Sequence, residues 1–200
     1  RAIKLSSMLC KFSFFLLSAI CIPCIFEMPQ ILSLWLGDVP QYTILFARMA
    51  LIAGMVDTLT LGLSVINEAV GNIRSYNLIV STLKLMTLPL IWLSLHLGVD
   101  LKWVAFIYIS VEFLSAIARI PFVHYTAGLN IKKFFISVAL RECIPFAFLI
   151  LSNIIIVNYV DIYFRFVMTI SLSCIIYAIA IFLIGLEKEE KKYILQFIRK

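Results

Sequence analysis

Long apolar runs separated by short polar turns fill most of this chain. A helix that crosses a bilayer needs about 20 mainly apolar residues. Six runs of that kind follow one another, at residues 12–36, 42–70, 76–97, 103–125, 134–157 and 162–186. Four of them contain proline, which spanning helices tolerate because neighbouring groups re-satisfy the freed carbonyls. The pattern predicts an all-α membrane protein, a polytopic bundle of about six transmembrane helices over residues 1–186.

The last 14 residues, EKEEKKYILQFIRK, have a different character. Their polar start is followed by Tyr193, Ile194, Phe197 and Ile198, which recur at helical spacing. Such a pattern is typical of an amphipathic helix that lies on the membrane surface. We therefore predict a second region, a cytoplasmic amphipathic tail at residues 187–200, with a solvated end as the alternative.

The composition agrees with a membrane protein, since 63% of the residues are hydrophobic and only 14% are charged, whereas soluble domains carry about 25% charged residues. The net charge of +6 does not indicate nucleic acid, because the basic residues lie between the apolar runs. One side of the predicted membrane collects most of them: Arg1, Lys4, Lys11, Arg74, Lys132, Lys133 and the tail. The other side has mainly Lys102. Because cytoplasmic loops are rich in Lys and Arg, we expect both ends of this segment to be cytoplasmic.

Five ionisable side chains lie at membrane depth: Arg48, Asp57, Lys84, Glu112 and Arg119. A rise of about 1.5 Å per residue places Asp57 and Glu112 near mid-membrane. Glu112 and Arg119 are seven residues apart and share a helix face, whereas Arg48 and Asp57 lie on nearly opposite faces. Intramembrane charges are costly and face a bundle interior or a watery cavity. They can therefore be structural pairs, such as Lys84 with Glu112, or the lining of a hydrated substrate cavity.

The sequence contains few residues or motifs that are typical of catalysis or metal binding. The two histidines, His96 and His124, lie at opposite ends of spans, and no zinc-protease, P-loop or nucleophile-elbow motif occurs. Cys21 and Cys24 form C-I-P-C, which can be a redox pair, but they lie inside a span and we interpret them as buried, inert thiols. We expect neither an enzyme nor a bound cofactor or metal.

Several short strings point to one family. Residues 34–42, LWLGDVPQY, resemble the L-W-L-G-x-V-P-x-Y segment of bacterial polysaccharide flippases, which move O-antigen or capsule repeat units and belong to the multidrug/oligosaccharidyl-lipid/polysaccharide exporter superfamily. Residues 46–48 (FAR) and 57–59 (DTL) also look like that family. So does the turn at 71–76 (GNIRSY), although Asn72 replaces the basic residue usual there.

The resemblance implies a fold and a function. It makes the chain the C-terminal part of a longer transporter, the second lobe of a two-lobed flippase whose N-terminal lobe lies upstream of Arg1. The function implied is the flipping of polyprenyl-pyrophosphate-linked oligosaccharide repeat units across the bacterial inner membrane by alternating access. Its expected partners are the lipid-linked oligosaccharide, membrane lipids, the missing lobe and a coupling cation.

Depth, rather than the family, suggests roles for the charged residues. Arg48, Lys84 and Arg119 are expected to form cationic cavity walls, with Asp57 and Glu112 balancing them or coupling to an ion. The alternatives are a drug or peptidoglycan-precursor exporter of the same superfamily, a membrane-embedded glycan-modifying enzyme, and a subunit that only binds partners.

Overall fold

The computed structural model describes residues 2–71, 73–159, 165–187 and 190–191. Within them the regular structure is entirely helical, without a β-strand. The elements are α1 (Ala2–Leu36), α2 (Thr43–Thr58), α3 (Leu61–Val70), α4 (Ile73–Leu85), α5 (Thr87–His96), α6 (Leu101–Ala127), α7 (Ile131–Phe134), the π-helix η1 (Phe135–Leu140), α8 (Arg141–Tyr159), α9 (Arg165–Ala180) and the π-helix η2 (Ile181–Gly185).

Five helical stretches in the described chain are long and apolar enough to cross a membrane. They are Ala2–Leu36, Arg74–His96, Leu101–Ala127, Ile131–Tyr159 and Arg165–Gly185. Together α2 and α3 are also long and apolar enough for one span, with a bend of 44° at the break between them. The chain is therefore an all-α polytopic bundle of about six spans, which confirms the fold class predicted from the sequence.

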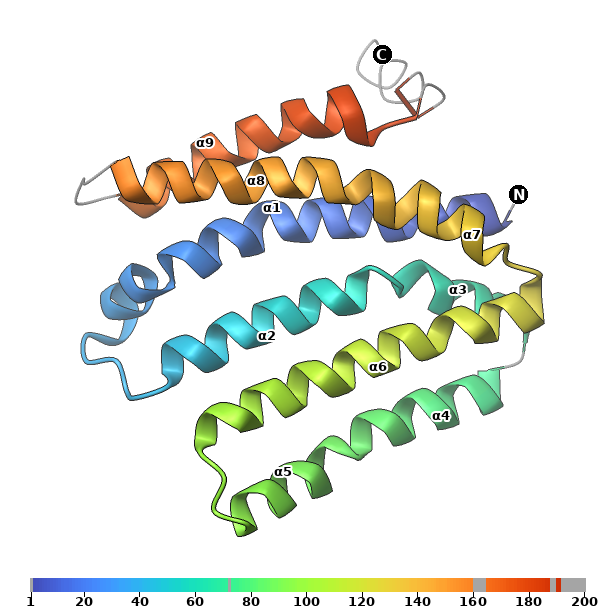
Figure 1. Ribbon diagram of the computed structural model, residues 1–200. Helices are drawn as coiled ribbons and strands as arrows, with labels where there is room; N and C mark the ends of the chain where they lie inside the picture. Colours follow the sequence, from blue (N-terminus) through green and yellow to red (C-terminus); the bar gives the residue numbers. More distant parts are fainter. Residues whose placement is uncertain (1, 72, 160–164, 188–189, 192–200) are drawn as a thin grey trace.

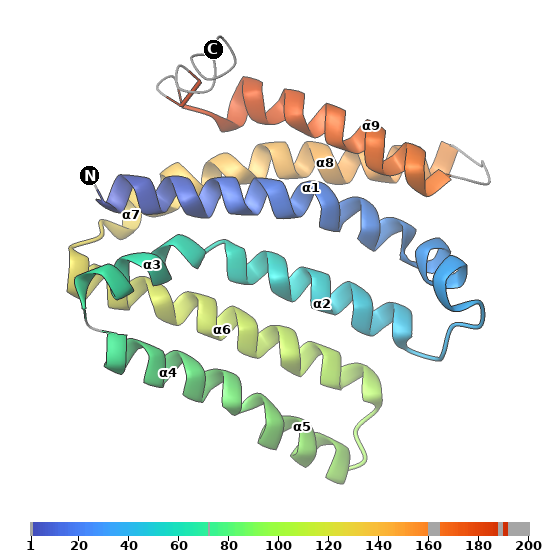
Figure 2. The same cartoon turned by 180° about the vertical axis from the view of Figure 1, so that it is seen from behind.

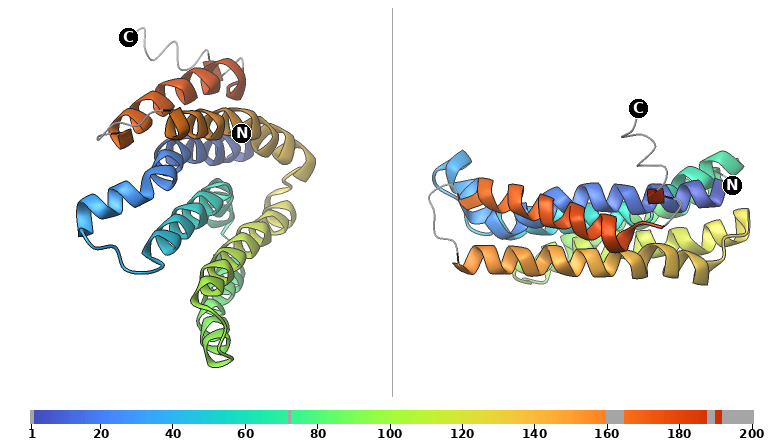
Figure 3. Two further views of the ribbon diagram at one scale, coloured as in Figure 1. Left: turned by 60° about the vertical axis from the view of Figure 1, so that its left-hand side comes forward. Right: turned by 90° about the horizontal axis from the view of Figure 1, so that it is seen from above.

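The spans lie side by side in the order α9, α8, α1, α2, α6 and α4 across the bundle, where the neighbours α8 and α1 run in the same direction, as do α2 and α6 (Figures 1 and 2). Helix α1 is central, because it packs against α2 and α3 on one side and α8 and α9 on the other (Figure 3). The turns at Gly71 and Gly128 lie at the same end of the bundle as the start of α1. We call this the Gly71 end and the opposite one the Gly98 end.

Two buried apolar clusters hold the helices together. One joins α1, α3, α6 and α7 near the Gly71 end through Cys10, Leu63, Val123 and Phe134. The other surrounds the middle of α1. Because hydrocarbon does not drive helices together as water does, close packing of small residues matters in membranes. Gly62 meets this need: its carbonyl accepts the Ser6 hydroxyl at 2.5 Å, directly across the contact between α3 and α1.

The outer surface is apolar in the way a bilayer requires. Large apolar side chains are exposed along α1, α4, α5, α6, α8 and α9, whereas α2 exposes none. Trp35, Trp92 and Trp103 are all exposed and lie towards the Gly98 end. Tryptophan is enriched at membrane–water interfaces, so this end carries the aromatic residues expected at a boundary of the bilayer.

Three details differ from the sequence-based expectation. The first helix begins at Ala2 rather than near residue 12, so it includes Lys4 and Lys11. The second span is broken between Thr58 and Leu61, although the sequence there has neither proline nor a polar turn. Two π-helical stretches, η1 and η2, were not foreseen. Most of the expected amphipathic tail lies outside the described residues.

Candidate functional site

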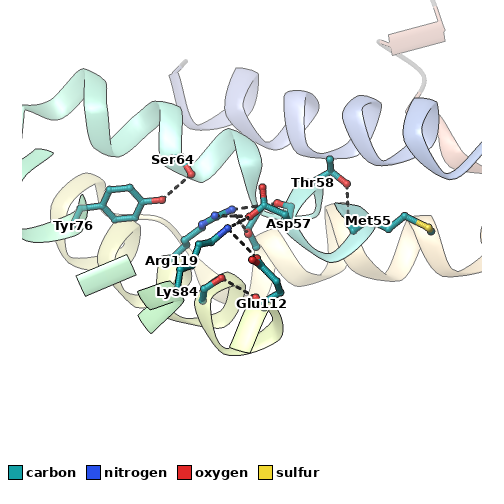
Figure 4. Close-up of polar contacts among 10 residues, drawn as sticks. Met55, Asp57, Thr58, Ser64, Tyr76, Lys84, Glu112 and Arg119 are labelled. Atoms are coloured by element: carbon teal, nitrogen blue, oxygen red, sulfur yellow. Dashed lines mark hydrogen bonds and ion pairs between the residues drawn. The ribbon is translucent and has the colours of Figure 1, made fainter. Parts of the chain in front are cut away.

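Four of the five charged residues singled out from the sequence come together between three spans. Asp57 lies on α2, Lys84 on α4, and Glu112 and Arg119 on α6 (Figure 4). Arg119 Nη2 lies 2.6 Å from Asp57 Oδ1, and Lys84 Nζ lies 3.3 Å from the same oxygen. Lys84 also forms an ion pair of 2.9 Å with Glu112. We call these four residues the charged network; its two cations balance its two carboxylates.

The charged network explains the break in the second span. In a continuous helix the N–H of Leu61 would donate to the carbonyl of Asp57. At the break, Thr60 N donates to that oxygen at 3.3 Å instead. Arg119 Nη1 adds a second bond of 3.2 Å to the same carbonyl and one of 3.2 Å to the Thr60 hydroxyl. A cation at a helix C-terminus is favourable, so Arg119 caps the end of α2 as well as pairing with its last acid.

The charged network is open on one side. Asp57, Lys84 and Glu112 each fall near the middle of their spans, far from either end of the bundle. The Arg119 side chain is only 6% exposed and that of Glu112 13%. By contrast, the Lys84 side chain is 38% exposed and that of Asp57 32%. One face of the bundle therefore presents a charged pair at mid-span depth.

Arg48 lies apart from the charged network, as its position opposite Asp57 predicted. Its Nε donates to the carbonyl of Ile25 on α1 at 2.8 Å. That carbonyl is the one that Pro29 leaves without its helical donor, since proline has no N–H. Among the described residues, the two Nη groups of Arg48 have neither a hydrogen bond nor an ion pair. Arg48 is thus anchored through one nitrogen to a neighbouring helix.

A second line of polar side chains, not foreseen from the sequence, runs between α1, α8 and α9. Its residues on α9 are spaced by four and share one face: Arg165, Thr169, Ser173 and Tyr177. Each finds a partner on a neighbouring helix. Tyr177 bonds the Ser18 hydroxyl at 2.7 Å, and Ser173 donates to Asn153 at 3.1 Å. The four-residue spacing on α9 was the signal in the sequence that could have revealed this line.

Glu27 on α1 ends this line near the Gly98 end. Its carboxylate is fully buried, with 0% exposure. Arg165 donates to it from Nε at 2.9 Å and from Nη2 at 3.1 Å. Thr169 adds a hydroxyl bond of 3.0 Å. A buried carboxylate needs such bidentate and hydrogen-bonded compensation, so this pair joins α9 firmly to α1.

No protein-family model, no curated protein and no solved structure matches this chain.

Proposed function

We propose that this chain is the second lobe of a flippase that moves polyprenyl-pyrophosphate-linked oligosaccharide repeat units across the bacterial inner membrane. In this proposal the Gly71 end, where the Lys and Arg residues of the turns gather, is cytoplasmic. Alternating access arises from rocking this bundle against a partner lobe. The string at residues 34–42 and its place between the first two spans support this family over other exporters.

The observation that carries the proposal is the exposure of Lys84 and Asp57 at mid-span. A charged side chain at the centre of a bilayer costs about 2.5–3.5 kcal/mol on insertion scales. Contact between this face of the bundle and lipid is therefore energetically unfavourable. A water-filled path beside a partner lobe removes that cost, and it is also what a polar sugar and a pyrophosphate need.

Arg48 is the cation best suited to the cargo. Lys84 and Arg119 are engaged with carboxylates, so they hold helices together and lend little net charge. The Nη groups of Arg48 have no acidic partner within the described chain. A guanidinium binds phosphate oxygens through two parallel hydrogen bonds, and the bond to Ile25 orients this one between α1 and α2.

Genetic complementation tests the proposal. The full-length gene is placed in a strain that lacks its own repeat-unit flippase, and surface polysaccharide is measured. We expect restoration by the native sequence and loss with Arg48→Gln at unchanged membrane level. Lys102→Gln is the matched control, because Lys102 is an exposed cation beside a turn whose ion-pair partner within the described residues is Asp100.

One outcome would reject the flippase assignment, and another would reject the role of Arg48. Normal insertion of the native protein without restored polysaccharide would exclude the repeat-unit flippase and favour a drug or peptidoglycan-precursor exporter. Full activity of Arg48→Gln would exclude a role for this residue in holding cargo.

A further inference from the structure

Glu142 is a buried acid that nothing compensates directly. It lies in the first turn of α8 and is 2% exposed. Throughout the described residues, neither of its carboxylate oxygens has a hydrogen-bond partner. Glu27 is buried to the same degree but has Arg165 and Thr169. The two acids therefore differ in compensation rather than in depth.

Within the described part of the chain, α1 and α9 carry groups that interact with Glu142. Cys10 and Lys11 on α1 and Tyr177 on α9 are close enough to interact with it electrostatically. Of these only Lys11 is a cation, and its Nζ is already 2.7 Å from Glu190. Both members of that pair are buried, at 3% and 4% side-chain exposure.

The neighbouring Arg141 is also engaged, with Glu187 at 2.9 Å. The Tyr177 hydroxyl is bonded to Ser18. Each of these charged or polar groups therefore has a partner other than Glu142.

An unpaired carboxylate in such a place is strongly disfavoured. Binding a proton removes the charge without needing any ligand from the protein. A metal cation would need several oxygen ligands instead, and the thiol and the bonded phenol beside Glu142 do not provide them. The surroundings of Glu142 therefore fit a proton.

Lys11, which interacts with Glu142, also borders a cavity at the Gly71 end. This cavity of about 100 Å³ is lined by Lys11, Ser137, Glu187 and Glu190, among others. One water needs roughly 10–15 Å³ on this measure, so the cavity has room for several. Ser137 belongs to the π-helix η1, which directly precedes α8. Such widened turns loosen the helical hydrogen-bond ladder and recur at functional sites.

We propose that Glu142 takes up and releases one proton during transport, with Lys11 as a counter-ion shared between Glu142 and Glu190. When Glu142 carries the proton, Lys11 pairs with Glu190, as in this structure. When the O–H bond breaks, the proton passes to water in the cavity and Lys11 moves to the new carboxylate. Glu190 then loses its ion pair with Lys11 and retains the hydrogen bond from the backbone N–H of Glu187, so the link between α1 and the end of the last span is weakened. This inference rests on the proposed transport function.

Infrared spectroscopy of the full-length protein in lipid tests the proton-binding part alone. At neutral pH, Glu142→Gln should remove one carboxylic-acid C=O band relative to the native protein. Glu27→Gln is the matched control and should remove a carboxylate band instead. Lys11→Met should let the Glu142 acid band persist to higher pH. Loss of a carboxylate band in Glu142→Gln would overturn the proposal.

Transport in vesicles tests the coupling. The native rate should respond to an imposed pH difference across the membrane, whereas Glu142→Gln, which mimics the protonated acid in shape and charge, should not respond. A normal pH response in this variant would refute proton coupling at Glu142, even if the flippase assignment holds. If complementation fails instead, the infrared result still decides whether Glu142 binds a proton.

Discussion

Arg48 and Pro29 form a pair whose separate roles can be measured. Pro29 deprives the Ile25 carbonyl of its helical donor, and Arg48 Nε supplies a donor at 2.8 Å from the next helix. Arg48→Met removes the donor while keeping a long, unbranched side chain. Pro29→Ala returns a backbone N–H to the position from which helix geometry directs it at Ile25. The double variant then needs no arginine to satisfy that carbonyl.

The expected sizes follow from this one bond. Leaving a buried carbonyl without a donor costs about 1–3 kcal/mol. Because Arg48 and Ile25 are only half-buried, we expect the lower part of that range, about 1–2 kcal/mol for Arg48→Met. In the Pro29→Ala background the same change should cost less than about 0.5 kcal/mol, which gives a coupling energy of roughly 1 kcal/mol.

The assay is the free energy of unfolding of the purified full-length protein in mild detergent, measured for all four members of the cycle. An equal loss for Arg48→Met in both backgrounds would show that Arg48 does not stand in for the missing N–H of Pro29. Polysaccharide export adds a second readout. If Arg48 holds cargo, Pro29→Ala should rescue stability but not export; rescue of both would reduce Arg48 to a structural role.

Two further predictions concern packing and pH. Gly62→Ala should destabilise the protein by about 1–3 kcal/mol, because a Cβ there would collide with the Ser6 carbonyl. Gly54→Ala is the control and should be neutral or stabilising, because its Cβ would meet only a leucine methyl at 3.9 Å. Equal thermal stabilities of the two variants would contradict the close contact at Gly62. The backbone N–H of Lys102 donates to the Asp100 carboxylate and holds the pKa of Asp100 below its ordinary value. The stabilisation of the fold by the ionised Asp100 should therefore be complete above about pH 4 and be lost as the pH falls through the lowered pKa. The difference in unfolding free energy between the native protein and Asp100→Ala should then shrink in acid; a difference that grows in acid would contradict this.

The spans and the charged network could be predicted because both depend on local pattern. Apolar runs of bilayer length identify the helices, and a constant rise per residue gives the depth of each charge. A structural pair of Lys84 with Glu112 was one of the two interpretations of these charges, and the structure has them 2.9 Å apart. The spacing of nine residues placed Arg48 and Asp57 on nearly opposite helix faces, and Arg48 bonds to α1 instead.

Local pattern did not predict the break at Thr60 or the partners of the polar residues on α9. The break depends on Arg119, which is distant in sequence and competes for the Asp57 carbonyl. The polar residues of α9 are recognisable as a stripe, but their partners on α1 are more than a hundred residues away. Which side of a helix meets which neighbour is a property of packing, and a single sequence without a packing order does not specify it.

Helix α1 contacts both Arg48 and the groups around Glu142, so it connects the proposed cargo site with the proposed proton site. Towards α2 and α3 it offers the Ile25 carbonyl to Arg48 and the Ser6 hydroxyl to Gly62. Towards α9 and the end of the last span it presents Glu27 and Lys11. A change of partner at Lys11 therefore acts on the same helix that positions Arg48. Because packed helices shift between discrete arrangements rather than deform continuously, proton release at Glu142 can reach the proposed cargo cation through a movement of α1 alone.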